Sequence, residues 1–295
     1  NIIALCSSPS YDNNMFIDGF SEESWKALNR NQDLPLINRP LALQNEPGST
    51  FKLITALSAL QHGIITPETE FLCEGSIVVG DTTFRCWKHQ GHGLLSLKEA
   101  IAGSCNCYFY NVGLKTPLDS IVETAQKFGF GQLLNTNLPE EASGLLPSKH
   151  WRKKFLKTKW QLGDTLNIVI GHGYLMATPL QLCVFASRLA TGREVMPTLT
   201  ATNENRIFQK INISEQNLSY IQDGMFTVAN SRIGTAYRNF APSRKMGIQV
   251  VAKTGTAQVI STKKENIKML QEERKNRDHG ICISYGPYRK PKYAV

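Results

Sequence analysis

The sequence predicts an α+β domain in which strands from both ends of the chain share one antiparallel sheet, flanked by helices. Two observations support this prediction. Helical patterns cluster in the middle of the 295 residues, and β-branched stretches lie near both ends. Strands grouped apart from helices are typical of α+β folds, whereas parallel α/β sheets alternate the two elements.

The first residues, 1–10, have the composition of a strand and lack the basic and apolar regions of a signal peptide. The last residues, 289–295, stop where another strand begins. No apolar run approaches the ~20 residues that span a bilayer. We interpret the sequence as a piece of a longer protein, so the lack of an anchor does not locate that protein.

Three segments in the middle of the chain have helical patterns. In residues 49–63, apolar residues recur at three-residue steps before a glycine, which predicts a helix. Two later segments share another pattern, in which Thr caps the helix, Pro occupies its first turn and Gly ends it. These positions are Thr116, Pro117 and Gly129 in one segment and Thr178, Pro179 and Gly192 in the other.

Two β-branched stretches near the C-terminus predict strands. The first covers about residues 248–260, and the second, 280–295, turns at Gly286-Pro287 into a third strand. The segment 261–279 between them is polar and of mixed charge. We expect an exposed loop or helix there.

The net charge of +9 favours an acidic partner only weakly. The densest basic stretch, 149–160, interleaves Trp151, Phe155 and Trp160 with lysines. Such a stretch fits a nucleic-acid or membrane-surface patch, or a solvated amphipathic segment whose aromatic side chains turn inward. We favour the solvated segment and expect no nucleic-acid partner.

Ser49 and Lys52 lie three residues apart at the start of the first predicted helix, on one face of it. A serine hydroxyl is a poor nucleophile without an adjacent base, and a desolvated lysine can serve as that base. A capping serine beside a surface lysine would give the same short pattern. S-x-x-K alone therefore does not decide between catalysis and structure.

Two further motifs follow in order along the chain. Ser104 and Asn106 form S-x-N after a helical stretch, and Lys253-Thr254-Gly255 lies inside the predicted strand. Glycine within a strand marks a place where another group approaches the backbone closely. The ordered set S-x-x-K, S-x-N and K-T-G is the known signature of penicillin-binding proteins and related β-lactamases.

Over nearly its whole length the chain resembles the transpeptidase domain of class B penicillin-binding proteins, and most of all their elongation subfamily, the penicillin-binding protein 2 type. The stretches that carry the resemblance are SSPSYD, NRPL, PGSTFK, FRCWKHQGHG, FGFG, GLLPS, GDTLNIVIGHGYL, TPLQL and KTGTAQV. It implies the penicillin-binding and serine β-lactamase fold with an all-helical subdomain. We expect one domain over residues 1–295, with a small excursion at about 70–95 and without the family's anchor, pedestal region and C-terminal end.

The resemblance implies a D,D-transpeptidase that crosslinks peptidoglycan during cell-wall elongation. Ser49 would attack the penultimate D-alanine of a stem peptide, and Lys52 would take its proton. Ser104 and Asn106 would relay a proton to the leaving amine and hold the peptide. The backbone amides of Ser49 and Thr256 would form the oxyanion hole.

Substrate binding is implied for the strand that carries the third motif. Lys253, Thr254, Gly255 and Thr256 would bind the terminal carboxylate of stems that end in D-Ala-D-Ala, and β-lactams would trap the enzyme as mimics. The implied partner of the full-length protein is a membrane-embedded SEDS-type glycosyltransferase. The implied location is the bacterial inner membrane, with the catalytic domain in the periplasm.

Two positions depart from the family's usual sequence. The middle strand begins His279-Gly280-Ile281-Cys282, where His-Ala-Trp-Phe is usual, and His172 stands where glutamine is commoner. A base role for His172 is possible, but we favour a packed or surface histidine.

Three other functions compete with a transpeptidase. A class A β-lactamase needs a glutamate in E-x-x-x-N to activate water, and Glu140 and Glu141 lack the asparagine at that spacing. A β-lactam sensor would not be expected to carry the FRCWKHQGHG and TPLQL stretches. A structural wall-binding module has no reason to keep Ser49 and Lys52 on one helical face.

Cysteine and histidine residues gather before and within the second motif. Cys73, Cys86, His92 and Cys105 form a Cys3His set, which is a known ligand set for structural zinc. The excursion that contains three of them has little apolar content to fold it. We expect zinc to fasten this excursion behind Ser104 and Asn106.

Two alternatives to zinc stay open for the seven cysteines. Cys73 and Cys86 could form a disulfide in an oxidising periplasm, or the thiols could be unpaired. We expect Cys107, two residues after Cys105, to face the opposite way as a buried core thiol. Cys183 should also be a buried core thiol.

Overall fold

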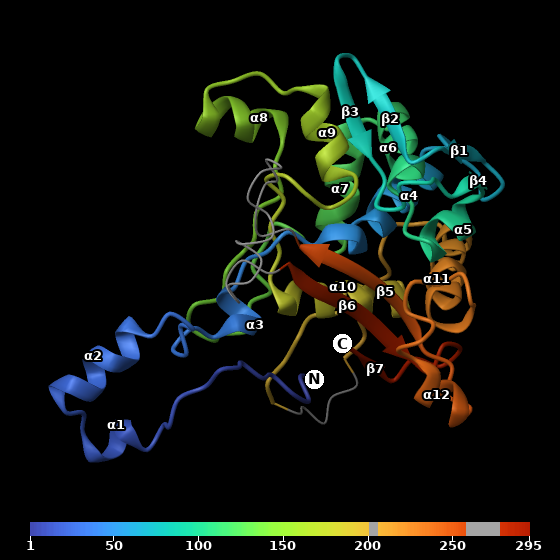
Figure 1. Ribbon diagram of the computed structural model, residues 1–295. Coiled ribbons are helices and arrows are strands. Elements are labelled where there is room, and N and C mark those ends of the chain that lie inside the picture. The colour runs from blue at the N-terminus through green and yellow to red at the C-terminus, as the bar shows by residue number, and fades with distance from the viewer. Residues whose placement is uncertain (201–205, 258–277) are drawn as a thin grey trace.

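The computed structural model describes residues 1–200, 206–257 and 278–295 (Figure 1). The helices are α1 (Met15–Asp18), α2 (Glu22–Arg30), α3 (Arg39–Ala42), α4 (Lys52–Gln61), α5 (Leu97–Ala102), α6 (Asn106–Lys115), α7 (Leu118–Lys127), α8 (Lys149–Trp151), α9 (Leu162–Ile168), α10 (Pro179–Thr191), α11 (Glu215–Asn230) and α12 (Ala241–Lys245), with the 3₁₀ turn η1 (Gly48–Thr50) and the π-helical turn η2 (Arg152–Leu156). The strands are β1 (Phe71–Cys73), β2 (Ser76–Val79), β3 (Thr82–Arg85), β4 (Gly93–Leu95), β5 (Val251–Ala257), β6 (His279–Gly286) and β7 (Tyr293–Ala294).

The main sheet is antiparallel, in the order β5-β6-β7, and α10 and α11 pack against it. These are the strands that the C-terminal sequence predicts, although β5 begins at Val251 instead of residue 248. The predicted extension of this strand to residue 260, and most of the segment 261–279, lie outside the described residues. The mixture of helices with an antiparallel sheet confirms the α+β class.

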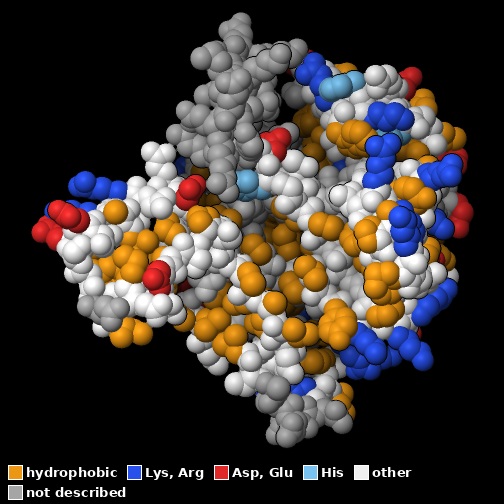
Figure 2. Space-filling model, turned by 60° about the horizontal axis from the view of Figure 1, so that its bottom comes forward, with side chains coloured by type: hydrophobic (Ala, Val, Ile, Leu, Met, Phe, Trp, Pro, Cys, Tyr) orange, Lys and Arg blue, Asp and Glu red, His pale blue; other side chains and the backbone are white. Residues whose placement is uncertain are grey.

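The predicted N-terminal strand is wrong for the part of the chain that the structure describes. Residues 1–6 run beside a groove that α10, β6 and β7 also line, and the Ile2 amide donates to the Thr198 carbonyl at 2.8 Å. Figure 2 shows hydrophobic side chains gathered on this side of the molecule. A strand requires a partner ladder, which local β-propensity cannot supply.

Helix α4 forms the centre of the hydrophobic core. Residues 52–60 are all buried, so this helix is enclosed on every side. Helices α6, α7 and α11 pack against it, and the Phe51 ring lies edge-on to Phe130. The S-x-x-K motif therefore lies at the start of a deeply buried helix. None of the described helices is long and apolar enough to cross a membrane.

The predicted helix signals are confirmed for α10 and shifted for α7. Thr178 caps α10 with a reciprocal bond to Gln181, and Gly192 ends the helix in a left-handed conformation. Helix α7 is preceded by Pro117, not capped by Thr116. The Thr116 hydroxyl instead donates to the Val112 carbonyl at 2.8 Å, which closes the preceding helix α6.

Residues 70–95 form two small antiparallel pairs, β1 with β4 and β2 with β3. In Figure 1 they extend beside α6, where the chain carries the second motif. The Phe84 ring packs against Tyr110 of α6, and the Trp87 indole reaches back to the loop before that helix. The excursion therefore contacts the active-site loop directly.

The basic stretch 149–160 folds as α8, η2 and a loop. Trp160 donates to the Thr165 hydroxyl at 2.8 Å, and Trp151 packs against Tyr174 with ring centroids 5.2 Å apart. These contacts agree with aromatic side chains that turn inward. Phe155 does not follow the prediction, because its side chain is 60% exposed.

Candidate active site and metal site

Ser49 stands in the turn η1, at the N-terminal end of α4, and is half-buried. The preceding Gly48 has φ +53°, and its amide donates to the Gly171 carbonyl at 3.0 Å. A Cβ at Gly171 would lie 1.9 Å from the Gly48 carbonyl oxygen. Two glycines therefore let two backbone segments meet behind the serine.

The third motif approaches the same turn from strand β5. A Cβ at Gly48 would lie 2.4 Å from the Thr256 carbonyl oxygen, and one at Gly255 would lie 2.9 Å from the Pro47 carbonyl oxygen. A side chain at either position would push the strand away from Ser49. The close approach that glycine in the strand predicts is therefore present, and it brings the backbones of residues 48 and 256 side by side.

Lys52 is fully buried, and its ammonium group points at the second motif. Its Nζ donates to the Asn106 side-chain oxygen at 2.6 Å and to the Ser104 carbonyl at 2.8 Å, and lies 3.3 Å from the Ser104 hydroxyl. Burial lowers the pKa of Lys52 to about 8, because a charged amine is poorly solvated there. Near neutral pH, a useful fraction of Lys52 is therefore the free base.

Lys253 enters the same centre from β5 and is also fully buried. Its Nζ donates to the Ser104 hydroxyl at 2.9 Å and to the Thr254 carbonyl at 2.9 Å. Burial and then the charge of Lys52 lower its pKa well below the ordinary value. The Ser104 hydroxyl thus lies between two lysine amines, a position suited to proton transfer.

The Ser49 hydroxyl makes no hydrogen bond to the described residues, so the expected contact with Lys52 is not formed here. Lys52 is one turn away and is engaged with Ser104 and Asn106. Catalytic hydrogen bonds are often long without substrate and shorten when it binds. The catalytic role of each residue remains a prediction, while their convergence is a feature of the fold.

The loop of the second motif is strained and held from outside. Ser104 has φ +53°, a left-handed conformation that is costly for a residue with a side chain. The Trp87 indole donates to the Ser104 carbonyl at 3.1 Å, and the Asn106 side chain donates to the Arg85 carbonyl at 3.2 Å. The excursion therefore helps to fix both polar residues of this motif.

Sequence reasoning missed Thr235, which lies in the turn after α11. Its hydroxyl is 2.6 Å from the Thr254 hydroxyl, and its amide donates to the Ala102 carbonyl at 3.1 Å. Thr235 therefore orients a hydroxyl that the resemblance assigns to substrate binding. No spacing rule in the sequence indicates this contact, because the two residues meet only through packing.

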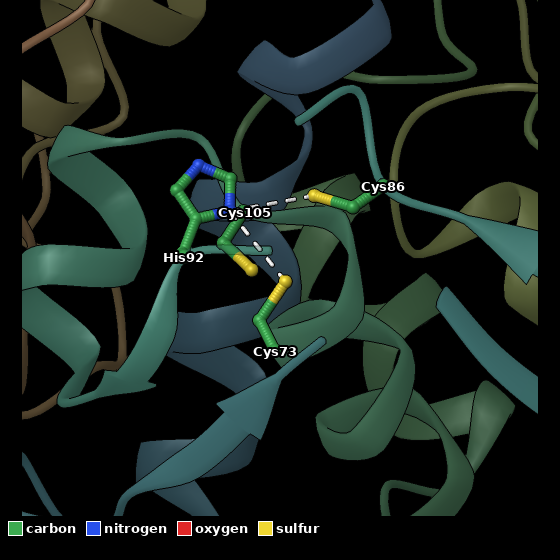
Figure 3. A group of neighbouring side chains, drawn as sticks. All are labelled: Cys73, Cys86, His92 and Cys105. Atoms are coloured by element: carbon green, nitrogen blue, oxygen red, sulfur yellow. Dashed lines mark hydrogen bonds between the residues drawn. The ribbon is translucent and has the colours of Figure 1, made fainter. Parts of the chain in front are cut away.

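The four predicted metal ligands converge, as Figure 3 shows. One donor atom from each of Cys73, Cys86, His92 and Cys105 lies within 4.8 Å of every other. The His92 Nδ1 atom is 3.5 Å from the sulfur of Cys73 and 3.5 Å from that of Cys86. All three thiols are buried, so the donors face one another and not the solvent.

Several details of this sulfur cluster fit a zinc ion. The Asn106 amide donates to the Cys86 sulfur at 3.4 Å, and the Tyr108 amide donates to the Cys105 sulfur at 3.5 Å. Such N–H donors stabilise thiolates that bind metal. Three sulfurs and one imidazole are a ligand set typical of structural zinc.

Two expectations about the other cysteines are corrected. Cys107 is buried, but it lies beside Cys86 and Cys73 instead of facing away, and its hydrogen bond with Cys86 together with burial raises its pKa. The backbone is extended at Cys105 and helical from residue 106 onward. The side chains of Cys105 and Cys107 therefore do not point in opposite directions, contrary to the expectation. Cys183 is only half-buried beside the N-terminal groove. The structure contains no disulfide between Cys73 and Cys86.

A serine at a helix start, two buried lysines and a K-T-G strand form the arrangement that penicillin-binding proteins and related β-lactamases share. The family model of the penicillin binding protein transpeptidase domain matches residues 1–295. The chain therefore belongs to this family.

Individual relatives agree with this assignment. The chain is 34% identical over 312 residues to peptidoglycan D,D-transpeptidase MrdA of Salmonella typhimurium, which covers all of this chain and 49% of the relative. It is 33% identical over 308 residues to MrdA of Escherichia coli K12, with 48% of that protein covered. The chain thus spans about half the length of these curated relatives.

Solved structures share the fold. The Helicobacter pylori penicillin-binding protein PBP2 in complex with MreC superposes with a TM-score of 0.88 at 35% identity, over 98% of this chain and 52% of that chain. Pseudomonas aeruginosa PBP2 in complex with WCK 5153 gives 0.85 at 31% identity, over 98% of this chain and 64% of that one. The expected transpeptidase fold is confirmed.

Proposed function

We propose that this chain is the catalytic domain of a peptidoglycan D,D-transpeptidase of the elongation type, which works through an acyl-enzyme on Ser49. The observation that carries the proposal is the position of the Ser104 hydroxyl, 3.3 Å from the Lys52 amine and 2.9 Å from the Lys253 amine. Membership of the transpeptidase family supports it. The lowered pKa of the buried Lys52 also supports the proposal, because only the neutral amine can accept a proton.

In the first half of the reaction, neutral Lys52 accepts the proton of Ser49 while the serine oxygen attacks the carbonyl of the penultimate D-alanine. The amides of Ser49 and Thr256 stabilise the oxyanion. Protonated Lys52 then gives a proton to the Ser104 hydroxyl as that hydroxyl passes its own proton to the leaving D-alanine amine, so that Ser104 and neutral Lys52 are both restored. The peptide carbonyl is left esterified to Ser49, and one D-alanine departs.

The carboxylate end of the donor stem is bound by β5 in this proposal. The Lys253 amine and the hydroxyls of Thr254 and Thr256 donate hydrogen bonds to the carboxylate, and Gly255 leaves room for close approach. An amine from a neighbouring stem then attacks the ester, which frees Ser49 and forms the crosslink. A β-lactam carries the same acyl group and would acylate Ser49 in a slowly reversed reaction.

The structure offers no support for a β-lactamase based on the glutamates that the sequence pointed to. Glu141 accepts hydrogen bonds from the amide and hydroxyl of Thr136 and from the Leu134 amide. Burial opposes its ionisation, but these bonds outweigh burial and lower its pKa. Its carboxylate is therefore used to hold a loop and is poorly suited to activate water.

We also propose that Cys73, Cys86, His92 and Cys105 bind one structural zinc ion. When bound, zinc would supply a crosslink between the excursion and the second motif and no chemistry at Ser49. The convergence of the four donors supports this, as does the shared backbone, because Cys105 lies between Ser104 and Asn106.

For the whole protein we propose a place in the inner membrane with this domain in the periplasm. A structure of Helicobacter pylori PBP2 with MreC and one described as a peptidoglycan synthase complex are among those that share the fold. By analogy, we propose that a scaffold of the MreC kind and a SEDS-type glycosyltransferase bind the full-length protein.

Intact-mass spectrometry with benzylpenicillin tests the acyl-enzyme. We expect one adduct per chain that persists for many minutes and is absent in Ser49→Ala. Ser58→Ala is the matched control, because Ser58 is a buried serine of the helix α4 that follows Ser49, and its hydroxyl has no partner in the described part of the chain. Labelling that survives in Ser49→Ala would contradict the proposal, and release of the adduct within seconds would favour a β-lactamase.

A further inference from the structure

His172 takes no part in the proposed reaction, yet it lies against the catalytic turn. Its Nδ1 atom is 2.6 Å from one carboxylate oxygen of Glu46, and the other oxygen accepts the Gly173 amide at 2.8 Å. Both side chains are less than one-fifth exposed. One carboxylate therefore clasps two consecutive residues that are 126 and 127 positions away along the chain.

The clasp lies in the middle of a longer contact between two segments. On one side of it, Asn45 and Ala177 exchange both backbone hydrogen bonds, at 3.1 and 2.9 Å. On the other side, the Gly48 amide donates to the Gly171 carbonyl at 3.0 Å. Glu46 fills the gap between these bonds with its side chain. Ser49 is three residues after Glu46, so the clasp fixes the position of the turn that carries Ser49 relative to residues 171–173.

The turn has little freedom to adjust elsewhere. Gly48 and Gly171 already touch, and a Cβ at Gly255 would lie 3.4 Å from the Ser49 amide nitrogen. A shift of the turn would therefore move that amide relative to the one from Thr256. Because an oxyanion hole depends on the placement of two N–H donors, small displacements there slow acyl transfer strongly.

We propose that Glu46 and His172 are positioning residues that fix Ser49 and its amide for acylation. This inference rests on the proposed function of the same site. A carboxylate only accepts hydrogen bonds, so Nδ1 carries the proton toward Glu46 whether or not the ring is charged. The imidazole acts through Glu46 and not on the substrate. Glutamine at position 172 can donate the same bond, while leucine cannot.

The test is the acylation kinetics of Ser49 with a fluorescent penicillin, resolved into the binding constant K and the rate constant k2. Glu46→Ala and His172→Leu should each lower k2 about tenfold with K changed less than twofold. Glu46→Ala removes both contacts of the carboxylate and His172→Leu removes only one of them, so the double variant should lose no more than Glu46→Ala does, about tenfold and not a hundredfold. His172→Gln should keep k2 within threefold of the unmodified protein.

Glu123→Ala is the control, since it removes an exposed ion pair within α7 that includes neither Glu46 nor His172. Active-site titration gives the folded fraction, so that lost protein is not counted as lost rate. Unchanged k2 in both single variants, a hundredfold loss in the double variant, or a tenfold loss in His172→Gln would overturn the inference. Failure of the unmodified protein to label Ser49 would instead overturn the proposed function.

Discussion

The predicted catalytic centre and the sulfur cluster share three consecutive residues but are built differently. Ser104 and the Asn106 side chain face the catalytic centre, while Cys105 and the Asn106 amide face the cluster. In the catalytic centre, both buried amines have close oxygen partners, at 2.6 to 2.9 Å. In the cluster, His92 Nδ1 lies 3.5 Å from two of the sulfurs.

We interpret this difference as a separation of chemistry from support. In the predicted catalytic centre, the two buried amines already have oxygen partners. In the cluster, four donor atoms lie within 4.8 Å of one another, which is the arrangement expected of ligands to one metal ion. We therefore propose that a loop of the catalytic centre is fixed from behind by a site that takes no part in the reaction.

The largest effect is expected from a change that alters the predicted catalytic centre and leaves the sulfur cluster intact. Lys52→Ala should slow acylation of Ser49 by about a thousandfold, within the range known for removal of a general base. The change also removes a buried amine and leaves the side-chain oxygen of Asn106 without its partner, so the melting temperature must be followed alongside. Lys26→Ala, at an exposed ion pair of α2, is the control. Acylation within tenfold of normal in folded Lys52→Ala would assign the base to another residue.

The second largest effect is expected from a change that removes a ligand of the sulfur cluster. It tests whether the cluster supports catalysis by fixing the loop that carries Ser104 and Asn106. Cys105→Ser should lose the zinc, lower the melting temperature and slow acylation about 50-fold, as expected when the support of a site is removed. Cys6→Ser, an exposed thiol outside the cluster, should keep both metal and rate. Equal acylation rates in these two variants would separate the cluster from the active site.

The third effect is the pH dependence of acylation, which should follow the titration of Lys52 in the predicted catalytic centre and not a change in the zinc site. Lys52 has a pKa of about 8, lowered by burial, so it is protonated and inactive below that value. The acylation rate should rise about tenfold per pH unit from pH 6 to 7 and become level above about pH 8.5. A flat profile over pH 6–9, measured in a range where the zinc content is constant, would contradict a lysine base.

The smallest effect is expected at β5, which is proposed to bind the terminal carboxylate of the donor stem. Thr254→Ala should slow acylation about tenfold through loss of a hydrogen bond to a charged group, with little change in the melting temperature. Thr254 is only half-buried, so its side chain fills little of the core. Thr83→Ala, on the exposed strand β3, is the matched control. A large loss of stability with acylation intact would show that Thr254 is structural.

Much of the fold and both sites could be predicted from the sequence, because the signals are local. The Thr178 cap and the closing Gly192 define α10 by backbone chemistry alone. The three catalytic motifs and the Cys3His set are residue types whose chemistry is specific. The long spacings between these motifs do not show that they meet in space. Their convergence could be predicted only because the motifs occur in the same order as in the family that the chain resembles.

What could not be predicted depends on partners that the local sequence does not name. Residues 1–10 have strand composition but no ladder in the described structure. Cys107 turns toward the cluster because helix α6 begins between it and Cys105. The Thr235 contact with Thr254 and the Glu46 contact with His172 join distant segments through packing.

Native mass spectrometry of protein purified without chelator, before and after benzylpenicillin, tests the central claim most directly. The account predicts one zinc per chain in both samples and one penicilloyl group after the drug, on Ser49. The support and the chemistry would then be seen together in one molecule. Protein that gains the penicilloyl group but holds no zinc, with Cys73 and Cys86 oxidised to each other, would contradict the account.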